Sequence, residues 1–135
     1  MASNHQPQQH FEQALLHLAQ YGQVLAQSAH YLIPCRDGIG ADYWNSACLL
    51  QSQLHVSEML ALLKELEQKS GRVRPSHCIS LDIDLIAWGS DLAQMQFNPK
   101  KMPLALDVKI PMADIWPCKL FAAIAHDYPV VGHRC

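Results

Sequence analysis

Two aspartates separated by one residue, Asp82 and Asp84, have the type and spacing that most directly suggest chemistry. They alternate with Leu81, Ile83 and Leu85, and side chains alternate between the two faces of a β-strand. Both carboxylates would therefore project from one face, with backbone origins about 7 Å apart. Neighbouring carboxylates repel unless a cation lies between them, and Mg²⁺ prefers such oxygen ligands. The pattern indicates a magnesium site, but a half-exposed strand with solvated carboxylates shows the same alternation.

Two arginines, Arg72 and Arg74, precede the aspartates and share their spacing. Carboxylates that hold a metal and arginines that bind phosphate occur together in phosphoryl-transfer sites. The arginines could instead simply neutralise the aspartates, and the sequence leaves both interpretations open.

Two helices are predicted to position these residues. The first covers residues 7–21, with Pro7 suited to its first turn and Gly22 suited to its end. The second begins at Ser57 and ends at Gly71. Its apolar residues recur at helical spacing and predict a core-facing stripe: Met59, Leu62, Leu63 and Leu66.

Three strands are predicted, over residues 27–33, 45–54 and 79–88, and the third carries the aspartates. Residues 90–108 read as irregular, and a last helix is expected at about 118–126. The order helix, strand, strand, helix, strand predicts an α+β layered fold. One strand ahead of the first helix would make it βαββαβ, the ferredoxin-like arrangement.

Length and composition favour one domain over residues 1–135, with residues 1–6 as a polar tail. The formal net charge of −2 argues against nucleic-acid binding, and no apolar run is long enough to span a membrane. The first residues lack the pattern of a secretory signal, so a cytoplasmic protein is expected.

The five cysteines are odd in number and show no C-x-x-C pair, which favours reduced thiols over disulfides. The eight histidines are scattered along the chain. A zinc or redox protein is a weak hypothesis, because structural zinc usually has closely paired ligands and the sequence shows no such pairs.

Several motifs taken in order resemble those of one family. GRVR at 71–74 is followed by LDIDL at 81–85 and by Gly89. Upstream lie DYWNSA at 42–47 and ASN at 2–4. Together they resemble 6-hydroxymethyl-7,8-dihydropterin pyrophosphokinase, which transfers pyrophosphate from ATP in folate biosynthesis. The likeness covers roughly residues 2–89, and residues 90–135 are divergent.

The resemblance implies a ferredoxin-like βαββαβ core and a role for each matching residue. Asp82 and Asp84 would hold two Mg²⁺ ions that bridge the phosphates of ATP. Asn45 would hydrogen-bond the pterin ring, with Tyr43 nearby.

The resemblance assigns the remaining site residues to the nucleotide. Arg72 and Arg74 would approach the phosphates from a loop, and Glu67 and Ile83 would lie near the nucleotide. The family also implies a monomer whose partners are small molecules.

The sequence departs from the family at four functional positions. Ile79 and Ala105 stand where the family has arginines, Pro99 where it has a histidine, and Asp107 where it has an aromatic residue. Lys100 and Lys101 could still meet phosphate. Two functions therefore remain: an active pyrophosphokinase, or an impaired family member that binds pterin or nucleotide or serves as an interaction module.

In the family, the residues that match 2–4 follow the first strand of the sheet. The first strand is therefore expected to be absent from residues 1–135. Three arrangements could compensate: an upstream start, a strand supplied by a partner, or closure of the remaining strands around the gap.

Overall fold

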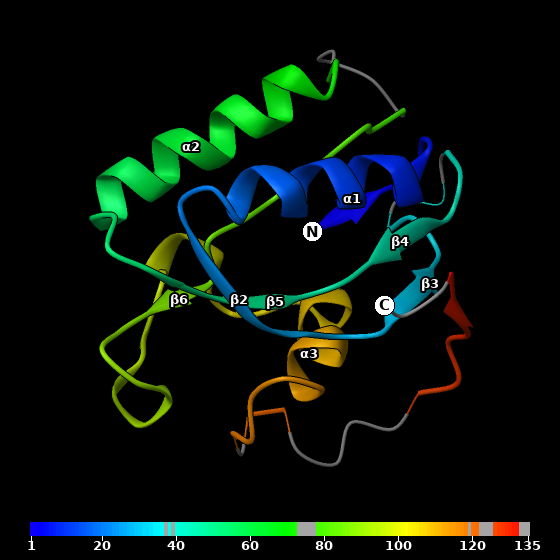
Figure 1. Cartoon of the computed structure of the whole chain (residues 1–135). Coiled ribbons are helices and arrows are strands. Elements are labelled where there is room, and N and C mark those ends of the chain that lie inside the picture. Colours follow the sequence, from blue (N-terminus) through cyan, green and yellow to red (C-terminus); the bar gives the residue numbers. More distant parts are fainter. Residues whose placement is uncertain (37, 39, 73–77, 119, 122–125, 133–135) are drawn as a thin grey trace.

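The computed structural model describes residues 1–135 except 37, 39, 73–77, 119, 122–125 and 133–135. Figure 1 shows the arrangement of the helices and short strands. The helices are α1 Pro7–Leu18, α2 Val56–Lys69 and α3 Leu106–Ala113. The strands are β1 Ala2–Ser3, β2 Gly22–Gln27, β3 His30–Ile33, β4 Tyr43–Asn45, β5 Cys48–Ser52, β6 Ala87–Trp88, β7 Gln96–Phe97 and β8 Val130–Val131.

A long antiparallel hairpin forms the centre of the fold. Its outer half pairs β2 with β5, and its inner half pairs β3 with β4. The two halves join where the Ser28 amide donates to the Ala47 carbonyl at 2.9 Å. The Ala47 amide donates in turn to Ser28 Oγ at 2.8 Å. The first arm is longer than predicted, because it begins at Gly22, and the second is shifted toward the amino terminus, from Tyr43 to Ser52.

Residues 1–4 form part of the sheet, which corrects the expectation of a polar tail and an absent first strand. In β1, Ala2 lies opposite Asn45 on one side. On its other side Ala2 exchanges two backbone hydrogen bonds with Asp82, of 2.7 and 2.8 Å. Ser3 is fully buried. The strand is short, but it occupies the interior position between the segment that carries the aspartates and β4.

Across the sheet, the segment around Asp82 comes first and is followed by β1, β4, β3 and β8. Neighbours in this order run antiparallel. With α1 and α2 connecting the strands, this is the predicted ferredoxin-like fold. The third predicted strand, 79–88, forms only in part, as the bridge at Asp82 and as β6 paired with β7.

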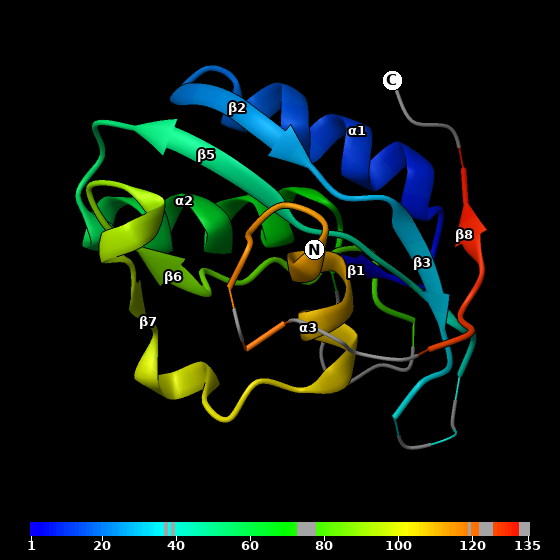
Figure 2. The ribbon, with the colours of Figure 1, turned by 90° about the horizontal axis from the view of Figure 1, so that it is seen from below.

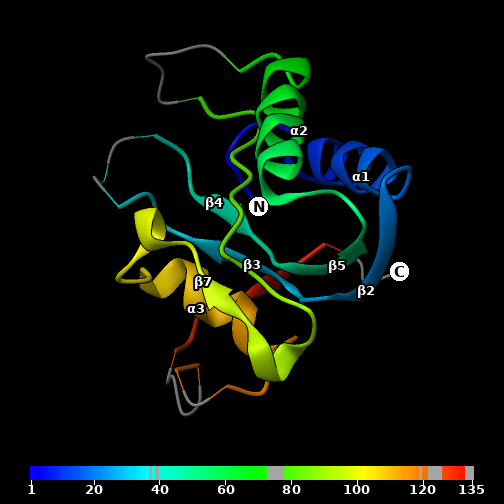
Figure 3. The ribbon, with the colours of Figure 1, turned by 90° about the vertical axis from the view of Figure 1, so that its left-hand side faces the viewer.

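The helices lie on opposite faces of the sheet. Figures 1 and 3 show α1 and α2 together on one face and α3 on the other. The core under α1 and α2 contains Phe11, Leu18, Leu62, Leu66, Leu81 and Ile83, among others. The apolar stripe predicted for the second helix is buried, as the spacing required. At the start of α2, the Glu58 carboxylate accepts the His55 amide at 3.0 Å, which closes a capping box.

The C-terminal part differs from the prediction. Helix α3 forms where the sequence read as irregular, and Pro111 lies inside it. Pro111 is the sixth of the eight residues, so it removes the hydrogen bond that an amide there would donate to the Asp107 carbonyl. The burial of its neighbours Ile110 and Met112 offsets this cost. The helix predicted at 118–126 lies largely outside the described residues, and Leu120 and Phe121 form a turn. Among the described residues, no helix is long and apolar enough to cross a membrane.

The burial of α1 gives a direct test of this packing. Phe11 is 1% exposed and Leu16, on the same helix, is 70% exposed. Phe11→Ala is expected to lower the free energy of unfolding by about 3–5 kcal/mol, because it leaves a cavity in the core. Leu16→Ala should change it by less than about 0.5 kcal/mol. Urea unfolding followed by circular dichroism measures both, and equal losses would contradict the burial of this face.

Candidate functional site

A row of four residues crosses the sheet and sets the geometry of the site. Asp82 lies opposite Ala2, Ala2 opposite Asn45, and Asn45 opposite Tyr31. Side chains of residues directly opposite each other project from the same face. The Tyr31 hydroxyl donates to the Asp114 carboxylate, just past α3, at 2.8 Å, so the row faces the α3 side. Because Ala2 is small, it leaves space between Asn45 and Asp82.

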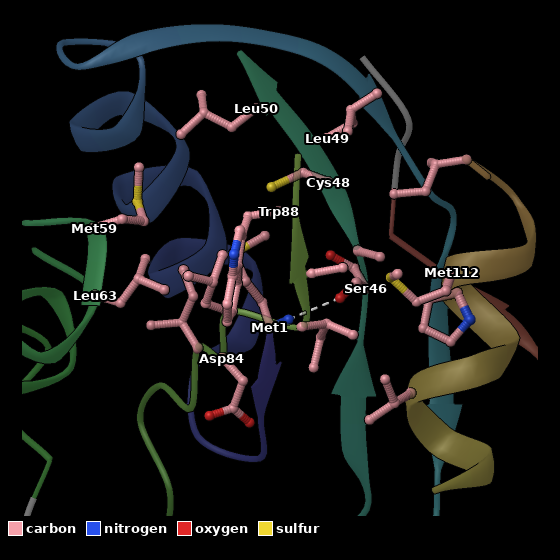
Figure 4. A pocket seen from close by; sticks show the side chains of 18 of the residues that line it. Met1, Ser46, Cys48, Leu49, Leu50, Met59, Leu63, Asp84, Trp88 and Met112 are labelled. Carbon is pink, nitrogen blue, oxygen red and sulfur yellow. Dashed lines mark hydrogen bonds between the residues drawn. The ribbon is translucent and has the colours of Figure 1, made fainter. Parts of the chain in front are cut away.

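The aspartates lie on the face that the alternation predicts. Leu81 and Ile83 are buried in the core beneath α1 and α2. Asp82 and Asp84 alternate with them and line a cavity of about 1130 Å³. Figure 4 shows the carboxylate of Asp84 at one side of this cavity, with apolar side chains beyond it.

The structure brings most of the predicted site residues to that cavity. Its lining includes six of them: Tyr43, Asn45, Arg72, Asp82, Ile83 and Asp84. Glu67 reaches the cavity indirectly, through its contact with Arg72. Arg74 lies outside the described residues, so its role stays a prediction. The side chain of Ile83 is in the core, on the opposite face from the aspartates.

Arg72 is held among carboxylates. Its side chain is 11% exposed and forms an ion pair with Glu67. The same guanidinium nitrogen lies 3.3 Å from Asp82 Oδ1 and 3.4 Å from the Leu81 carbonyl. The Arg72 Nε is buried, and no partner for it lies among the described residues. Arg72 therefore neutralises Asp82 and Glu67 in this arrangement.

Burial of Glu67 shifts its titration. Removal from water raises the pKa of Glu67, the charge of Arg72 opposes this effect, and Asp82 adds to it. The site therefore contains a carboxyl whose ionisation depends on an adjacent arginine.

A second cation lies on the other aspartate. The Lys101 Nζ is 2.8 Å from Asp84 Oδ1, and this hydrogen bond raises the pKa of Lys101. The short 3₁₀ helix Pro99–Lys101 presents Lys101, and the Asn98 side chain caps that helix through the Lys100 amide at 3.1 Å. The sequence left open that Lys101 could meet phosphate, and in the structure Lys101 pairs with a carboxylate.

An ion pair that the sequence did not reveal lies in the cavity lining. Arg36 donates to the two oxygens of Asp107 from Nε at 2.8 Å and from a terminal nitrogen at 2.5 Å. Asp107 raises the pKa of Arg36, chiefly through this hydrogen bond. The partners are far apart in the sequence, so no local pattern could have identified them. Asp107 was noted only as a departure from the family.

The proposed pterin-binding residues lie together on β4. Asn45 is 6% exposed, and its Nδ2 donates to the Tyr43 carbonyl at 3.4 Å. Both residues line the cavity. Ile79, where the family has an arginine, is buried, and its amide donates to Asn4 Oδ1 at 2.6 Å. It therefore supports the β1 segment and offers no charge to a ligand.

The donor set fits a hard divalent cation in part. Two carboxylates, Asp82 and Asp84, project from one face into one cavity, and carboxylate oxygens suit Mg²⁺. No cluster of three or more metal-ligating side chains occurs in the part of the chain that the structure describes. A Mg²⁺ ion here would complete its coordination with water and substrate oxygens, as this ion usually does.

Fold and site together define a ferredoxin-like domain whose paired carboxylates and arginines face a ligand-sized cavity. A comparison with family models matches residues 1–123 to the 7,8-dihydro-6-hydroxymethylpterin-pyrophosphokinase family. The chain therefore belongs to that family. A comparison with curated protein sequences found no match.

The coupling between Arg72 and Glu67 is testable. Arg72→Gln is expected to raise the pKa of Glu67 further, because it removes the charge that opposes desolvation. In the unfolded chain Glu67 loses its proton at its ordinary pKa, whereas in the folded protein it keeps the proton to higher pH. The free energy of unfolding therefore falls as pH rises from the ordinary Glu pKa through the raised one, and it should fall further in Arg72→Gln than in the unchanged protein. NMR titration of the Glu67 carboxyl carbon and urea unfolding at several pH values measure both effects.

The control is Lys69→Gln, which removes a cation from the same helix. Lys69 pairs with the exposed Glu65 at 2.9 Å. The pKa of Glu67 should stay unchanged in this variant. A Glu67 titration that does not respond to Arg72→Gln would show that the two groups are not coupled in solution.

Proposed function

We propose that this protein transfers pyrophosphate from ATP to the hydroxyl group of 6-hydroxymethyl-7,8-dihydropterin, releasing AMP. The observation that carries this proposal is the row across the sheet, which places Asp82 and Asn45 on one face of one cavity. Membership of the pyrophosphokinase family supports the same reaction. In this row the Asp82 carboxylate suits a metal-bound phosphate, and the Asn45 amide suits a heterocycle.

The reaction forms one bond and breaks one bond. The substrate hydroxyl oxygen attacks the β-phosphorus of ATP, and the bond from that phosphorus to the oxygen bridging to the α-phosphorus breaks. AMP leaves with that oxygen, and the hydroxyl proton passes to solvent. Such chemistry depends mainly on positioning and on neutralising charge, so it needs no covalent nucleophile.

Each described residue has a role in that arrangement. Asp82 and Asp84 would hold Mg²⁺, which supplies charge neutralisation at the phosphates when bound. Asn45 would donate to and accept from the pterin ring through its amide, with Tyr43 beside it. Arg72, whose guanidinium lies beside Asp82 in the cavity lining, would contact phosphate oxygens.

A second candidate function is ligand binding without turnover. It is favoured by the cations already on the aspartates, Lys101 on Asp84 and Arg72 on Asp82. It is also favoured by Ile79 and Ala105, which offer no charge where the family has arginines. In this alternative the protein binds pterin or nucleotide, and the charge needed to stabilise the transition state is incomplete.

An activity measurement separates the two functions. The protein is incubated with ATP, Mg²⁺ and 6-hydroxymethyl-7,8-dihydropterin, and AMP is quantified by chromatography. Asp82→Asn and Asp84→Asn are expected to lower the rate by a factor on the order of a hundred or more, because each removes a charged ligand of the metal.

The matched control is Asp127→Asn, the same change at an exposed position before β8. Its rate should equal that of the unchanged protein. If AMP never exceeds the enzyme-free background while calorimetry shows pterin or ATP binding, the binding function replaces the transferase. If neither ligand binds, both proposals fail.

The position of Lys101 predicts competition with metal. Lys101→Met keeps a long side chain and removes the charge beside Asp84, so Mn²⁺ should bind about fivefold more tightly. Lys100→Met, at the exposed neighbour, is the control and should leave the affinity unchanged. Titration of free Mn²⁺ by electron paramagnetic resonance measures both. Unchanged affinity in Lys101→Met would mean that Lys101 does not compete for the site.

A further inference from the structure

The Arg36–Asp107 ion pair lies at one end of the contact between α3 and β3. Asp107, Ile110 and Asp114 follow one another at spacings of three and four residues, so they share one face of the helix. This face meets β3, because Ile110 belongs to the same core cluster as Tyr31 and Asp114 accepts the Tyr31 hydroxyl. Figure 2 shows the first turn of α3 toward the arrowhead of β3, where the chain continues to Arg36. Asp107 is therefore directed toward the sheet at this end.

The ion pair holds the Arg36 guanidinium by one edge and leaves its other edge open. Two of the five guanidinium N–H groups donate to the Asp107 carboxylate, one from Nε and one from a terminal nitrogen. Within the described part of the chain, Asp107 is the acceptor of both. The Asp107 side chain is 16% exposed, whereas that of Arg36 is 68% exposed. The carboxylate thus fixes the guanidinium from the protein side, and the remaining three N–H groups are accessible to a ligand.

Arg36 interacts electrostatically with the carboxylates of the candidate metal site. Arg36, Asp107, Asp82 and Asp84 all line the same cavity. The hydrogen bond to Asp107 is the largest cause of the raised pKa of Arg36; burial opposes it, and the charges of Asp107, Asp82 and Asp84 add to it. The charges of both aspartates therefore reach the guanidinium. A metal ion on these aspartates would consequently share the cavity with a second, fixed positive charge.

The other cations beside the aspartates differ from Arg36 in what holds them. Arg72 pairs with Asp82, and Lys101 pairs with Asp84, so a metal ion on these carboxylates competes with both cations. Arg36 has a separate counterion on α3, so metal binding does not remove its partner. Its planar guanidinium also matches the geometry of phosphate oxygens better than an ammonium does.

We propose that Arg36 binds oxygens of the pyrophosphoryl group that is transferred, and that Asp107 positions Arg36 for this contact. A phosphate group between a metal ion and a guanidinium has positive charge on both sides, which stabilises the charge on its oxygens during transfer. The identity of this ligand rests on the proposed function. Because like charges repel, Arg36 should oppose the binding of metal alone and favour the binding of metal with phosphate. This reversal of sign separates a phosphate contact from a purely structural ion pair.

The test measures binding, so it does not require turnover. Calorimetry with Mg²⁺ uses the α,β-methylene analogue of ATP, in which carbon replaces the oxygen of the bond that breaks. Arg36→Gln should bind this analogue about tenfold more weakly, because it loses a hydrogen-bonded charge. Its affinity for AMP, which lacks the pyrophosphoryl group, and for 6-hydroxymethyl-7,8-dihydropterin should stay unchanged. Its affinity for free Mn²⁺, measured by electron paramagnetic resonance, should not fall.

Three further variants separate charge, geometry and structural support. Arg36→Lys keeps the charge without the planar fork, and Asp107→Asn keeps Arg36 without its full anchor, so each should weaken analogue binding about threefold. Lys64→Gln removes the same charge at an exposed position of α2 outside the cavity lining, and its affinity should equal that of the unchanged protein. Equal losses in Arg36→Gln and Asp107→Asn for every ligand, pterin included, would show that the pair only supports the structure and would overturn the proposal.

The remaining outcomes distinguish this contact from the proposed function. AMP formation by the unchanged protein, together with undiminished analogue binding in Arg36→Gln, would overturn the phosphate contact and leave the transferase function intact. Weaker binding of the pterin alone in Arg36→Gln would assign Arg36 to the heterocycle and overturn the phosphate contact as well. Weaker analogue binding in Arg36→Gln, with no AMP formed by the unchanged protein, would support the contact and remove the transferase function. An unchanged protein that does not bind the analogue would overturn both.

Discussion

Two backbone hydrogen bonds between Ala2 and Asp82 hold the aspartate segment against the rest of the sheet. Ala2 in turn lies opposite Asn45 on β4, so one short strand of two residues joins both ends of the site. Around Asp82 the chain has little other regular structure, since the only bridge it forms is to Ala2 within the described residues. The distance from the Asp82 carboxylate to the Asn45 amide thus depends on a pairing made by Ala2.

The electrostatics of the site follow from charges drawn from three parts of the fold. Arg72 follows α2, Lys101 lies after β7, and the Arg36–Asp107 pair links the segment after β3 to the first turn of α3. Each aspartate therefore has a cation beside it before any ligand binds. Neutralised carboxylates cost less to bury than unpaired ones. The charges of both aspartates are therefore balanced by side chains of the protein itself.

Much of the fold could be predicted from periodicity. The stripe of Met59, Leu62, Leu63 and Leu66 predicted α2, because burying one helix face is a local property of spacing. The order of helices and strands predicted the ferredoxin-like fold. Helix α3 was missed, since Pro111 and the lack of an amphipathic stripe hide a helix that tertiary packing stabilises. Residues 1–4 were misjudged as a tail because a strand of two residues has no periodicity to detect.

By itself, the sequence determined which residues could do chemistry and which face of the strand they share. The alternation around Asp82 and Asp84 required both carboxylates to oppose the core residues Leu81 and Ile83, and they do. Only the tertiary structure decided what surrounds them: Lys101 on Asp84, the Arg36–Asp107 pair, and the cavity that β5 helps to line. The physical reason is that side-chain direction follows from local backbone geometry, whereas ion pairs and cavities depend on contacts between residues distant in sequence.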